Sequence, residues 1–256
     1  MLAEFCGWGY AVLWGVSFYP SLILNWSIKS ADSISLDYLV LNICGYLCYS
    51  CSIFQMFFNS LVRQQFQLVY DGSLPLLTLA DLFYAFHGLL LQCILLTQVI
   101  FGNYLWKFKN ERRSYNVDKF TKVIILAFAC YLLIIYVGFS TNKELELCLN
   151  LATLKIFASL IKYIPQVRFN MRRRSMYGIS RIQVYLDASG AILCLSEFFI
   201  KNNLPITEAI NSNRGKVGIA VITLLFASIF IFQFSLYTDQ PPELKKNDIE
   251  LGYTKI

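Results

Sequence analysis

Seven apolar stretches, each long enough to cross a lipid bilayer, constrain this chain more than any other feature. A helix of roughly 20 apolar residues spans the hydrocarbon core of a membrane. The 256 residues are 57% hydrophobic and 15% charged, which is more apolar than soluble domains usually are. We therefore predict an all-α membrane protein with seven transmembrane helices. These are expected at Glu4–Trp26, Ser35–Phe58, Leu79–Phe101, Thr121–Phe139, Leu147–Phe169, Arg181–Ile200 and Lys216–Tyr237.

The distribution of basic residues predicts the orientation of these helices. Of the 22 Lys and Arg residues, 15 fall in the first, third and fifth loops, their helix edges and the tail, whereas 5 fall on the opposite side. Because cytosolic loops are enriched in Lys and Arg, we expect a cytosolic C-terminus and a lumenal N-terminus. The net charge of +6 then reflects topology, and no nucleic-acid partner is expected. The first helix lacks a basic n-region, so we expect it to be retained rather than cleaved as a signal peptide.

The sequence repeats itself at an offset of 145 residues. Helices one to three recur as helices five to seven, and helix four is a linker that leaves both repeats in the same orientation. Transporters with parallel repeats bind their substrates between the repeats, near mid-membrane. We predict a first repeat at 1–101, a linker at 102–146, a second repeat at 147–237 and a cytosolic tail at 238–256. The aligned pairs are Pro20 with Pro165, Asn25 with Asn170, Ser30 with Ser175, Asn42 with Asp187, and Gly45 with Gly190.

Two prolines at equivalent positions interrupt the first and fifth spans. Proline removes a backbone donor and kinks a helix, and freed carbonyls are tolerated in a membrane only where they face protein or a wet cavity. Pro20 and Pro165 therefore mark either static kinks or a hinge. Their recurrence in both repeats favours the hinge.

Charged residues inside the spans point to function, because they are costly in a membrane and rarely accidental. Asp187 lies in the sixth span, where the first repeat has Asn42. Burial disfavours an ionised carboxylate, so we expect Asp187 to take up a proton near the pH of an acidic compartment. A structural ion pair with Lys162 is the alternative.

Lys155 and Lys162 lie two helical turns apart, on one face of the fifth helix. Lys162-Tyr163 immediately precedes Ile164-Pro165-Gln166, which places a cation and a phenol beside the kink. A cation in a cavity suits a substrate carboxylate, whereas snorkelling to the interface could explain one of the two lysines.

Asp81 opens the third span, and His87, the only histidine, follows six residues later. At the same offset of 145, the second repeat has Phe226 and Phe232 at these positions. Histidine is the side chain suited to a pH switch, although a lone histidine is more often a packing residue. For Asp81 the alternative to coupling is stabilisation of a helix N-terminus. The sequence contains no evident metal-ligand cluster, phosphate-binding loop or nucleophile arrangement, so we expect neither enzyme activity nor a cofactor.

The two proline motifs, each followed by Asn, a basic-Ser pair and Ile-Ser, resemble those of the PQ-loop repeat family. The second copy has Pro165-Gln166, whereas the first departs from the motif with Pro20-Ser21. Within that family the chain is similar above all to the cystinosin family, including its fungal members. The resemblance covers nearly the whole chain and depends on Phe18-Tyr19-Pro20, Asn25-Trp26, Leu41-Asn42, Asp81, His87, Lys155, Lys162-Tyr163-Ile164-Pro165-Gln166, Leu186-Asp187 and Gly190.

This resemblance implies export of L-cystine from an acidic lumen, with protons as the coupling ion and no other cofactor. The family's proton carrier maps onto Asp187, and Asp81 is a second candidate for coupling. Gln183 replaces a family asparagine, and Phe226 replaces an aspartate of mammalian members. The implied substrate region comprises Asn42, Lys155, Lys162, Tyr163, Asn170 and Gln183, and the implied gate comprises Pro20, Pro165 and Gln166.

The C-terminal tail resembles a tyrosine-based sorting signal. Gly252, Tyr253 and Ile256 fit the pattern of a tyrosine followed two residues later by a bulky apolar position. On the cytosolic side, sorting adaptors could read it and direct the protein to a vacuolar, lysosomal or endosomal membrane.

Two alternatives to cystine transport remain at this stage. A PQ-loop transporter could carry a cationic amino acid or a sugar on the same scaffold. A retrieval-receptor-like protein could bind cargo without transporting it, although Lys245-Lys246 lies too far from Ile256 to form a terminal dilysine signal.

Overall fold

The computed structural model describes residues 2–69, 72, 79–111, 116–138, 142–201 and 214–241, without the side chains of 80, 81, 201 and 214–216. In this part of the chain, seven helical segments are long and apolar enough to cross a membrane. Each predicted span agrees with an observed one to within four residues at both ends. The elements are α1 (Leu2–Val16), α2 (Tyr19–Ile28), α3 (Leu36–Phe58), α4 (Ser60–Val69), α5 (Leu79–Ile100), α6 (Gly102–Leu105), α7 (Lys119–Val137), α8 (Lys143–Ile161), α9 (Tyr163–Arg173), α10 (Arg181–Lys201) and α12 (Arg214–Leu236).

The first and fifth spans are each broken into two helices by their proline. A proline cannot donate to the carbonyl four residues earlier, and its ring clashes with that carbonyl. Four residues before Pro20 and Pro165 stand Val16 and Ile161, and these are the last residues of α1 and α8. The predicted kinks are therefore present at equivalent places in both repeats. Hinge motion about them stays a prediction.

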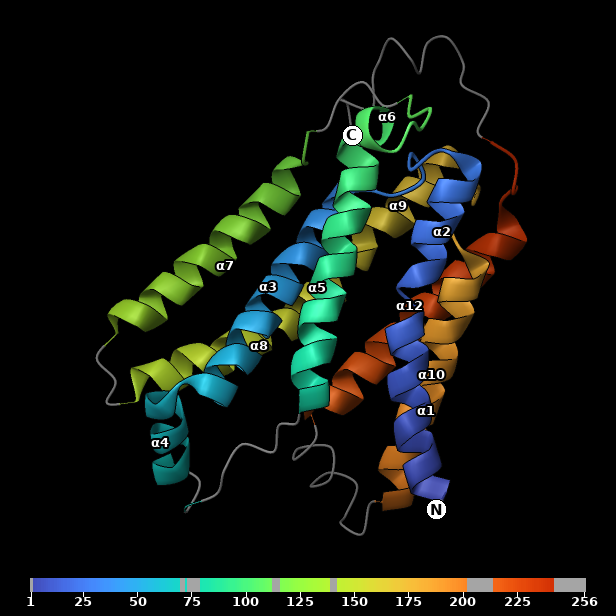
Figure 1. The fold of residues 1–256 in the computed structure, drawn as a ribbon. Coiled ribbons are helices and arrows are strands. Elements are labelled where there is room, and N and C mark those ends of the chain that lie inside the picture. The colour runs from blue at the N-terminus through green and yellow to red at the C-terminus, as the bar shows by residue number, and fades with distance from the viewer. Residues whose placement is uncertain are drawn as a thin grey trace.

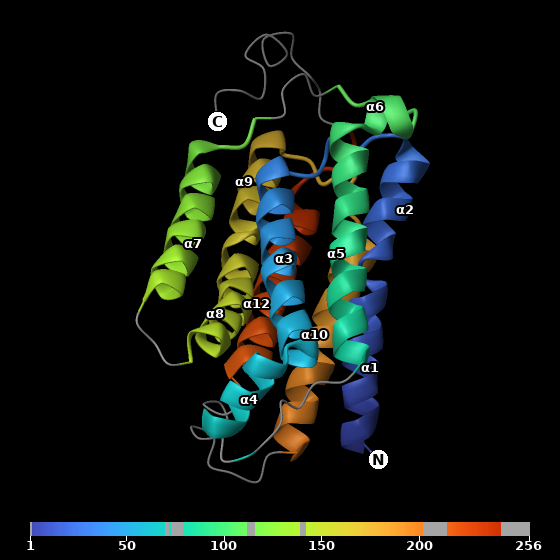
Figure 2. The same ribbon diagram turned by 60° about the vertical axis from the view of Figure 1, so that its left-hand side comes forward.

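The two repeats interlock rather than lie apart. Helix α1 packs against α10, and α8 packs against α3, so the first span of each repeat lies beside the second span of the other (Figures 1 and 2). Glycines permit both close approaches. A Cβ atom on Gly190 would lie 2.6 Å from Trp14 Cδ1, and one on Gly45 would lie 2.9 Å from Ala158 Cβ.

A pair of amide contacts ties the third helix of each repeat to the segment after the proline. In the first repeat, Asn25 Nδ2 donates to Gln98 Oε1 at 3.1 Å, and Gln98 Nε2 donates to the Leu22 carbonyl at 3.2 Å. Asn25 is fully buried, so the bond from its Nδ2 satisfies a donor that lipid could not. In the second repeat, the equivalent bonds join Asn170 Nδ2 to Gln233 Oε1 at 3.0 Å and Gln233 Nε2 to the Val167 carbonyl at 3.1 Å.

These contacts show that the offset of 145 does not extend into the third helices. The two glutamines are 135 residues apart, whereas their partners are 145 apart. The predicted alignment of Asp81 and His87 with Phe226 and Phe232 is therefore wrong, and His87 aligns with Ile222. The first repeat has a longer connection between its second and third spans, and that connection includes helix α4.

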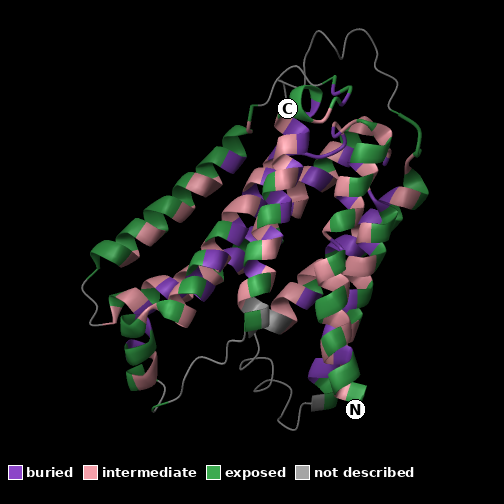
Figure 3. Cartoon of the chain, viewed as in Figure 1, coloured by how far each residue is buried: buried purple, intermediate pink, exposed green. Residues whose placement is uncertain are grey.

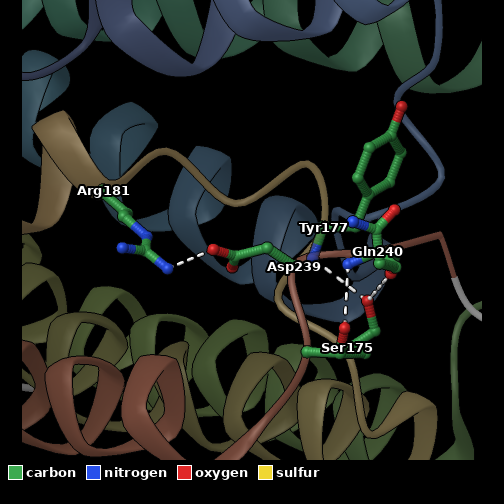
Figure 4. Close-up of polar contacts among 6 residues, drawn as sticks. Ser175, Tyr177, Arg181, Asp239 and Gln240 are labelled. Atoms are coloured by element: carbon green, nitrogen blue, oxygen red, sulfur yellow. Dashed lines mark hydrogen bonds and ion pairs between the residues drawn. The ribbon is translucent and has the colours of Figure 1, made fainter.

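The α2–α3 and α9–α10 loops, helix α6 and the end of α12 lie at one end of the bundle, opposite the N-terminus (Figure 1). We call this the loop end. Here the segment after α12 is fastened to the α9–α10 loop (Figure 4). Met176 N donates to the Thr238 carbonyl at 2.8 Å, and Ser175 Oγ donates to the Gln240 carbonyl at 2.6 Å. An ion pair between Arg181 and Asp239 adds to this attachment.

The outer surface of the bundle is apolar, as a lipid-facing surface must be. Exposed positions follow the outer faces of the helices, and α7 is exposed along most of its length (Figure 3). Leu126, Leu133 and Ile134 of this helix are 63%, 61% and 70% exposed. Lipid would cover this surface, because a water-soluble protein rarely leaves so large an apolar area open.

Candidate substrate site between the two repeats

A pocket with about 660 Å³ of empty space, its opening included, lies between the repeats. Most of its lining residues form pairs that the repeat relates to each other, so the pocket lies on the pseudo-two-fold axis. At the offset of 145, the pairs are Phe18 with Tyr163, Ser21 with Gln166, Ile34 with Ile179, and Tyr38 with Gln183; at the offset of 135, they are Gln92 with Ala227 and Leu95 with Phe230.

Polar contacts join the two repeats at the loop end of this pocket. Ser33 Oγ donates to the Gly178 carbonyl at 2.8 Å, and these two residues are themselves 145 apart, so the axis passes between them. Gln166 Nε2 donates to the Ser33 carbonyl at 2.9 Å, and its Oε1 accepts from Ser35 N at 2.7 Å. Gln166, a predicted gate residue, thus fastens the loop of the other repeat.

A second polar contact between the repeats lies at the loop end of the pocket, at the place that the repeat makes equivalent to that of Gln166. Ser21, the counterpart of Gln166, donates a hydrogen bond from its hydroxyl to Gln183 Oε1. Gln183 was predicted as a substrate contact, and it does line the pocket. In this conformation its amide oxygen is engaged by Ser21, so its substrate contact stays a prediction.

Lys162 lies at the break between α8 and α9, one layer behind the pocket wall. Its Nζ donates to Asn42 Oδ1 at 3.0 Å and lies 4.6 Å and 5.8 Å from the ring centroids of Tyr163 and Tyr38. Both tyrosines line the pocket. The structure therefore brings together three predicted substrate residues, Asn42, Lys162 and Tyr163, from both repeats.

Asp187 lines the pocket from α10. Its carboxyl group lies near the Ser17 hydroxyl, which donates to the Trp14 carbonyl at 2.9 Å, and its own backbone carbonyl accepts from Trp14 Nε1 at 3.2 Å. Ser17 and Lys162 are 145 apart, as are Asn42 and Asp187. The two pairs therefore occupy equivalent places in the two repeats with different chemistry. Lys162 donates a hydrogen bond to Asn42, whereas the Ser17 hydroxyl lies near the Asp187 carboxyl group.

Asp187 and Lys162 do not form the structural ion pair that was the alternative prediction. Both side chains are described, and no direct ion pair joins them. The two charges still influence each other electrostatically. A carboxylate and an ammonium group that stand near one pocket without direct contact can each meet an opposite charge of a bound molecule.

Lys155 and Asn170 have other surroundings. The Lys155 ammonium lies 3.3 Å from the centroid of the Tyr46 ring, and Lys155 is not among the residues that line the pocket. Asn170 is fully buried and accepts from Gln166 Nε2 at 2.9 Å. Both residues are packed in the helix bundle, and their predicted part in substrate binding stays a prediction.

Of the remaining predicted residues, His87 is not among those that line the pocket, and the others have side chains outside the described part of the structure. Asp81 belongs to α5, but its side chain is outside the described part of the structure. His87 Nε2 lies 2.7 Å from the Tyr19 hydroxyl and stacks on Phe83. The predicted sorting residues Gly252, Tyr253 and Ile256 lie outside the described residues. Within the described ranges, no group of His, Cys, Asp and Glu side chains could hold a metal ion.

Sequence reasoning missed several residues of the site. Ser17, Trp14 and Gln92 were not singled out, because hydroxyl, indole and amide side chains are not unusual in membrane helices. The repeat offset could have found Ser17, since it is the counterpart of Lys162. No pattern in the sequence marks Gln92, because its counterpart appears only once the register of the third helices is known.

Comparison with known proteins places this architecture in a family. The family model described as PQ loop repeat matches residues 2–62 and 147–207. A Saccharomyces cerevisiae protein named cystine transporter is 33% identical over 255 residues, which cover 95% of this chain and 96% of that protein. A cystinosin homolog of Dictyostelium discoideum is 30% identical, covering 92% of this chain and 81% of the relative.

Cystinosin of Bos taurus is 29% identical over 243 residues, which cover 94% of this chain but 65% of the bovine protein. The names of these relatives denote transporters and not enzymes, in agreement with the prediction from sequence. The relatives match along nearly all of this chain, and the repeat model matches both of its halves. The chain therefore belongs to the cystinosin family of PQ-loop repeat membrane proteins.

Proposed function

We propose that this protein exports L-cystine from the lumen of a lysosome or vacuole to the cytosol, coupled to protons, by alternating access. The observation that carries the proposal is the pocket on the pseudo-two-fold axis, with Asp187 on its wall and Lys162 directly behind it. Membrane transporters with internal repeats bind their substrates at the repeat interface. The relatives named cystine transporter and cystinosin supply the identity of the substrate.

The charges of the site suit the two ends of an amino acid. A zwitterion carries an ammonium group and a carboxylate, and Asp187 and Lys162 offer one charge of each sign without direct contact between them. Cystine is also two identical halves joined by a disulfide. A pocket whose lining is paired by a pseudo-two-fold axis presents similar surfaces to both halves.

Asp187 is the proposed proton carrier. It is the one position at which a carboxylate replaces the amide of the other repeat, Asn42. In the acidic lumen, protonation removes the negative charge from the pocket wall and weakens its attraction to Lys162. The change in net charge of the cavity is the step that we assign to coupling.

The polar contacts that join the two repeats at the loop end of the pocket form the proposed cytosolic gate. Opening on that side requires the bonds of Gln166 to Ser33 and Ser35 and the bond of Ser21 to Gln183 to separate. Pro20 and Pro165 lie next to these residues, and the helix breaks allow α2 and α9 to move relative to α1 and α8. Sorting adaptors that read Tyr253 and Ile256 are the proposed partners of the tail.

The test is uptake of labelled cystine by the purified full-length protein in liposomes, with an acidic or a neutral exterior. Wild type is compared with Asp187→Asn and with Asp239→Asn, an exposed aspartate at the loop end that serves as the control. We expect acid to stimulate uptake in wild type and in Asp239→Asn but not in Asp187→Asn. This result would support cystine as the substrate and Asp187 as the proton carrier.

Two other outcomes separate the alternatives. If labelled arginine or glucose is taken up but labelled cystine is not, the protein is a transporter of another solute. If no solute moves although the protein is correctly folded in the liposomes, the transport function is wrong and a cargo-binding role becomes the better account.

A further inference from the structure

The side chain of Gln92 stands out among the buried amides of the bundle. It lies on α5, is 5% exposed and lines the pocket. Its Oε1 atom is buried without a hydrogen-bond partner. Asn25 Oδ1 is also buried without a partner, but Asn25 does not line the pocket and its Nδ2 is hydrogen-bonded. The buried amides of Gln98, Gln166 and Gln233 are hydrogen-bonded. A buried polar atom without a partner is destabilising, so Gln92 requires an explanation that its neighbours do not.

Helix packing does not supply that explanation. At the equivalent position of the second repeat stands Ala227, which also lines the pocket. The next lining positions along the two helices, Leu95 and Phe230, are both apolar. The fold therefore accommodates a small apolar side chain at this place, and of this pair of equivalent positions only Gln92 brings a polar group to the pocket.

The chemistry of Gln92 Oε1 indicates which kind of group would be its hydrogen-bond partner. An amide oxygen accepts hydrogen bonds, so its missing partner is a donor. The Lys162 ammonium, which lies behind the pocket wall, is bound to Asn42. A donor for Gln92 can therefore enter with the substrate, and the ammonium group of an amino acid is such a donor.

We propose that Gln92 is a specificity-determining residue whose amide oxygen accepts a hydrogen bond from an ammonium group of the bound substrate. This inference rests on the proposed transport of cystine. It adds to the pocket a third-helix contact that selects amino acids over related disulfides without an amino group. Hydrogen bonds to charged groups are among the stronger ones in proteins, so losing this contact weakens binding measurably.

The test compares cystine with 3,3′-dithiodipropionate, which keeps the disulfide and both carboxylates but lacks both ammonium groups. For wild type and Gln92→Met, the KM of cystine and the inhibition constant of the analogue are measured in proteoliposomes. Methionine has a similar length and cannot accept a strong hydrogen bond. We expect the KM of cystine to rise about tenfold while the analogue is unaffected, a change of about 1.4 kcal/mol in binding.

Three further variants make the result specific. Gln92→Glu keeps an acceptor and should retain the preference for cystine over the analogue. Leu90→Met, on the exposed outer face of the same helix, should behave as wild type. If Gln92→Met does not fold, Gln92→Ala copies Ala227 of the other repeat and replaces it in the same measurement.

The outcomes distinguish this inference from the proposed function. Wild type without cystine transport would overturn the function itself. Wild-type transport together with an unchanged ratio of the two constants in a folded Gln92 variant would overturn the inference alone, and would mean that water satisfies the amide.

Discussion

The packing of Trp14 against Gly190 allows a prediction whose size follows from the structure. A Cβ atom added at Gly190 would lie 2.6 Å from Trp14 Cδ1 and 2.7 Å from its Nε1. Ordinary contact begins at 3.4 Å, so in Gly190→Ala the indole must withdraw by about 1 Å. That movement would break the 3.2 Å hydrogen bond from Trp14 Nε1 to the Asp187 carbonyl.

The expected cost combines three contributions. Overpacking in a well-packed interior costs about 1–3 kcal/mol, and loss of the hydrogen bond adds about 1 kcal/mol. Alanine in a helix returns up to about 1 kcal/mol relative to glycine. The matched control is Gly218→Ala on α12, where an added Cβ has no neighbour within 4 Å. It has the same gain in helix propensity without the steric cost, so the difference between the variants isolates the packing of Trp14.

Thermal unfolding of the two purified variants in detergent measures this difference. For a chain of this size, 1 kcal/mol corresponds to roughly 2–4 °C in Tm, so Gly190→Ala should unfold about 5 °C or more below Gly218→Ala. Because Trp14 contacts the backbone of Asp187, the same variant should also transport cystine more slowly. Equal Tm values for the two variants would refute the proposed close packing of α1 on α10.

The other predictions contrast a buried polar contact with an exposed one. Asn170→Leu leaves the amides of Gln166 and Gln233 without their shared partner, so we expect a loss of about 1–3 kcal/mol in stability; thermal unfolding checks this, and a wild-type Tm would contradict it. Asp239→Asn removes the exposed ion pair with Arg181, and we expect a change of less than about 1 kcal/mol; a Tm shift of more than a few degrees would show that this contact does more than fasten the chain after α12.

The family resemblance and the repeat could be read from the sequence because both depend on local patterns. The helix breaks follow from Pro20 and Pro165 alone, since a proline disrupts the helix that contains it wherever the chain then goes. The two αL helix ends, at Lys29 and Arg174, also obey the offset of 145. Such features require no knowledge of which helices pack together.

The register of the third helices could not be read in this way. The connection that contains α4 shifts the first repeat by ten residues relative to the second, and only the contacts of Gln98 and Gln233 reveal the shift. An apolar helix has many equivalent-looking alignments, so its sequence does not indicate where an insertion lies.

What the sequence by itself determined was the number of membrane spans, their duplication and the residues in which the two copies differ. A bilayer imposes length and apolarity on every span, and these constraints act on each segment separately. Only the tertiary structure decided that Lys162 contacts Asn42 while Asp187 lies near Ser17, and that Gln92 faces the pocket. Those contacts cross between repeats, and the packing of one helix on another selects them from many that the sequence alone would permit.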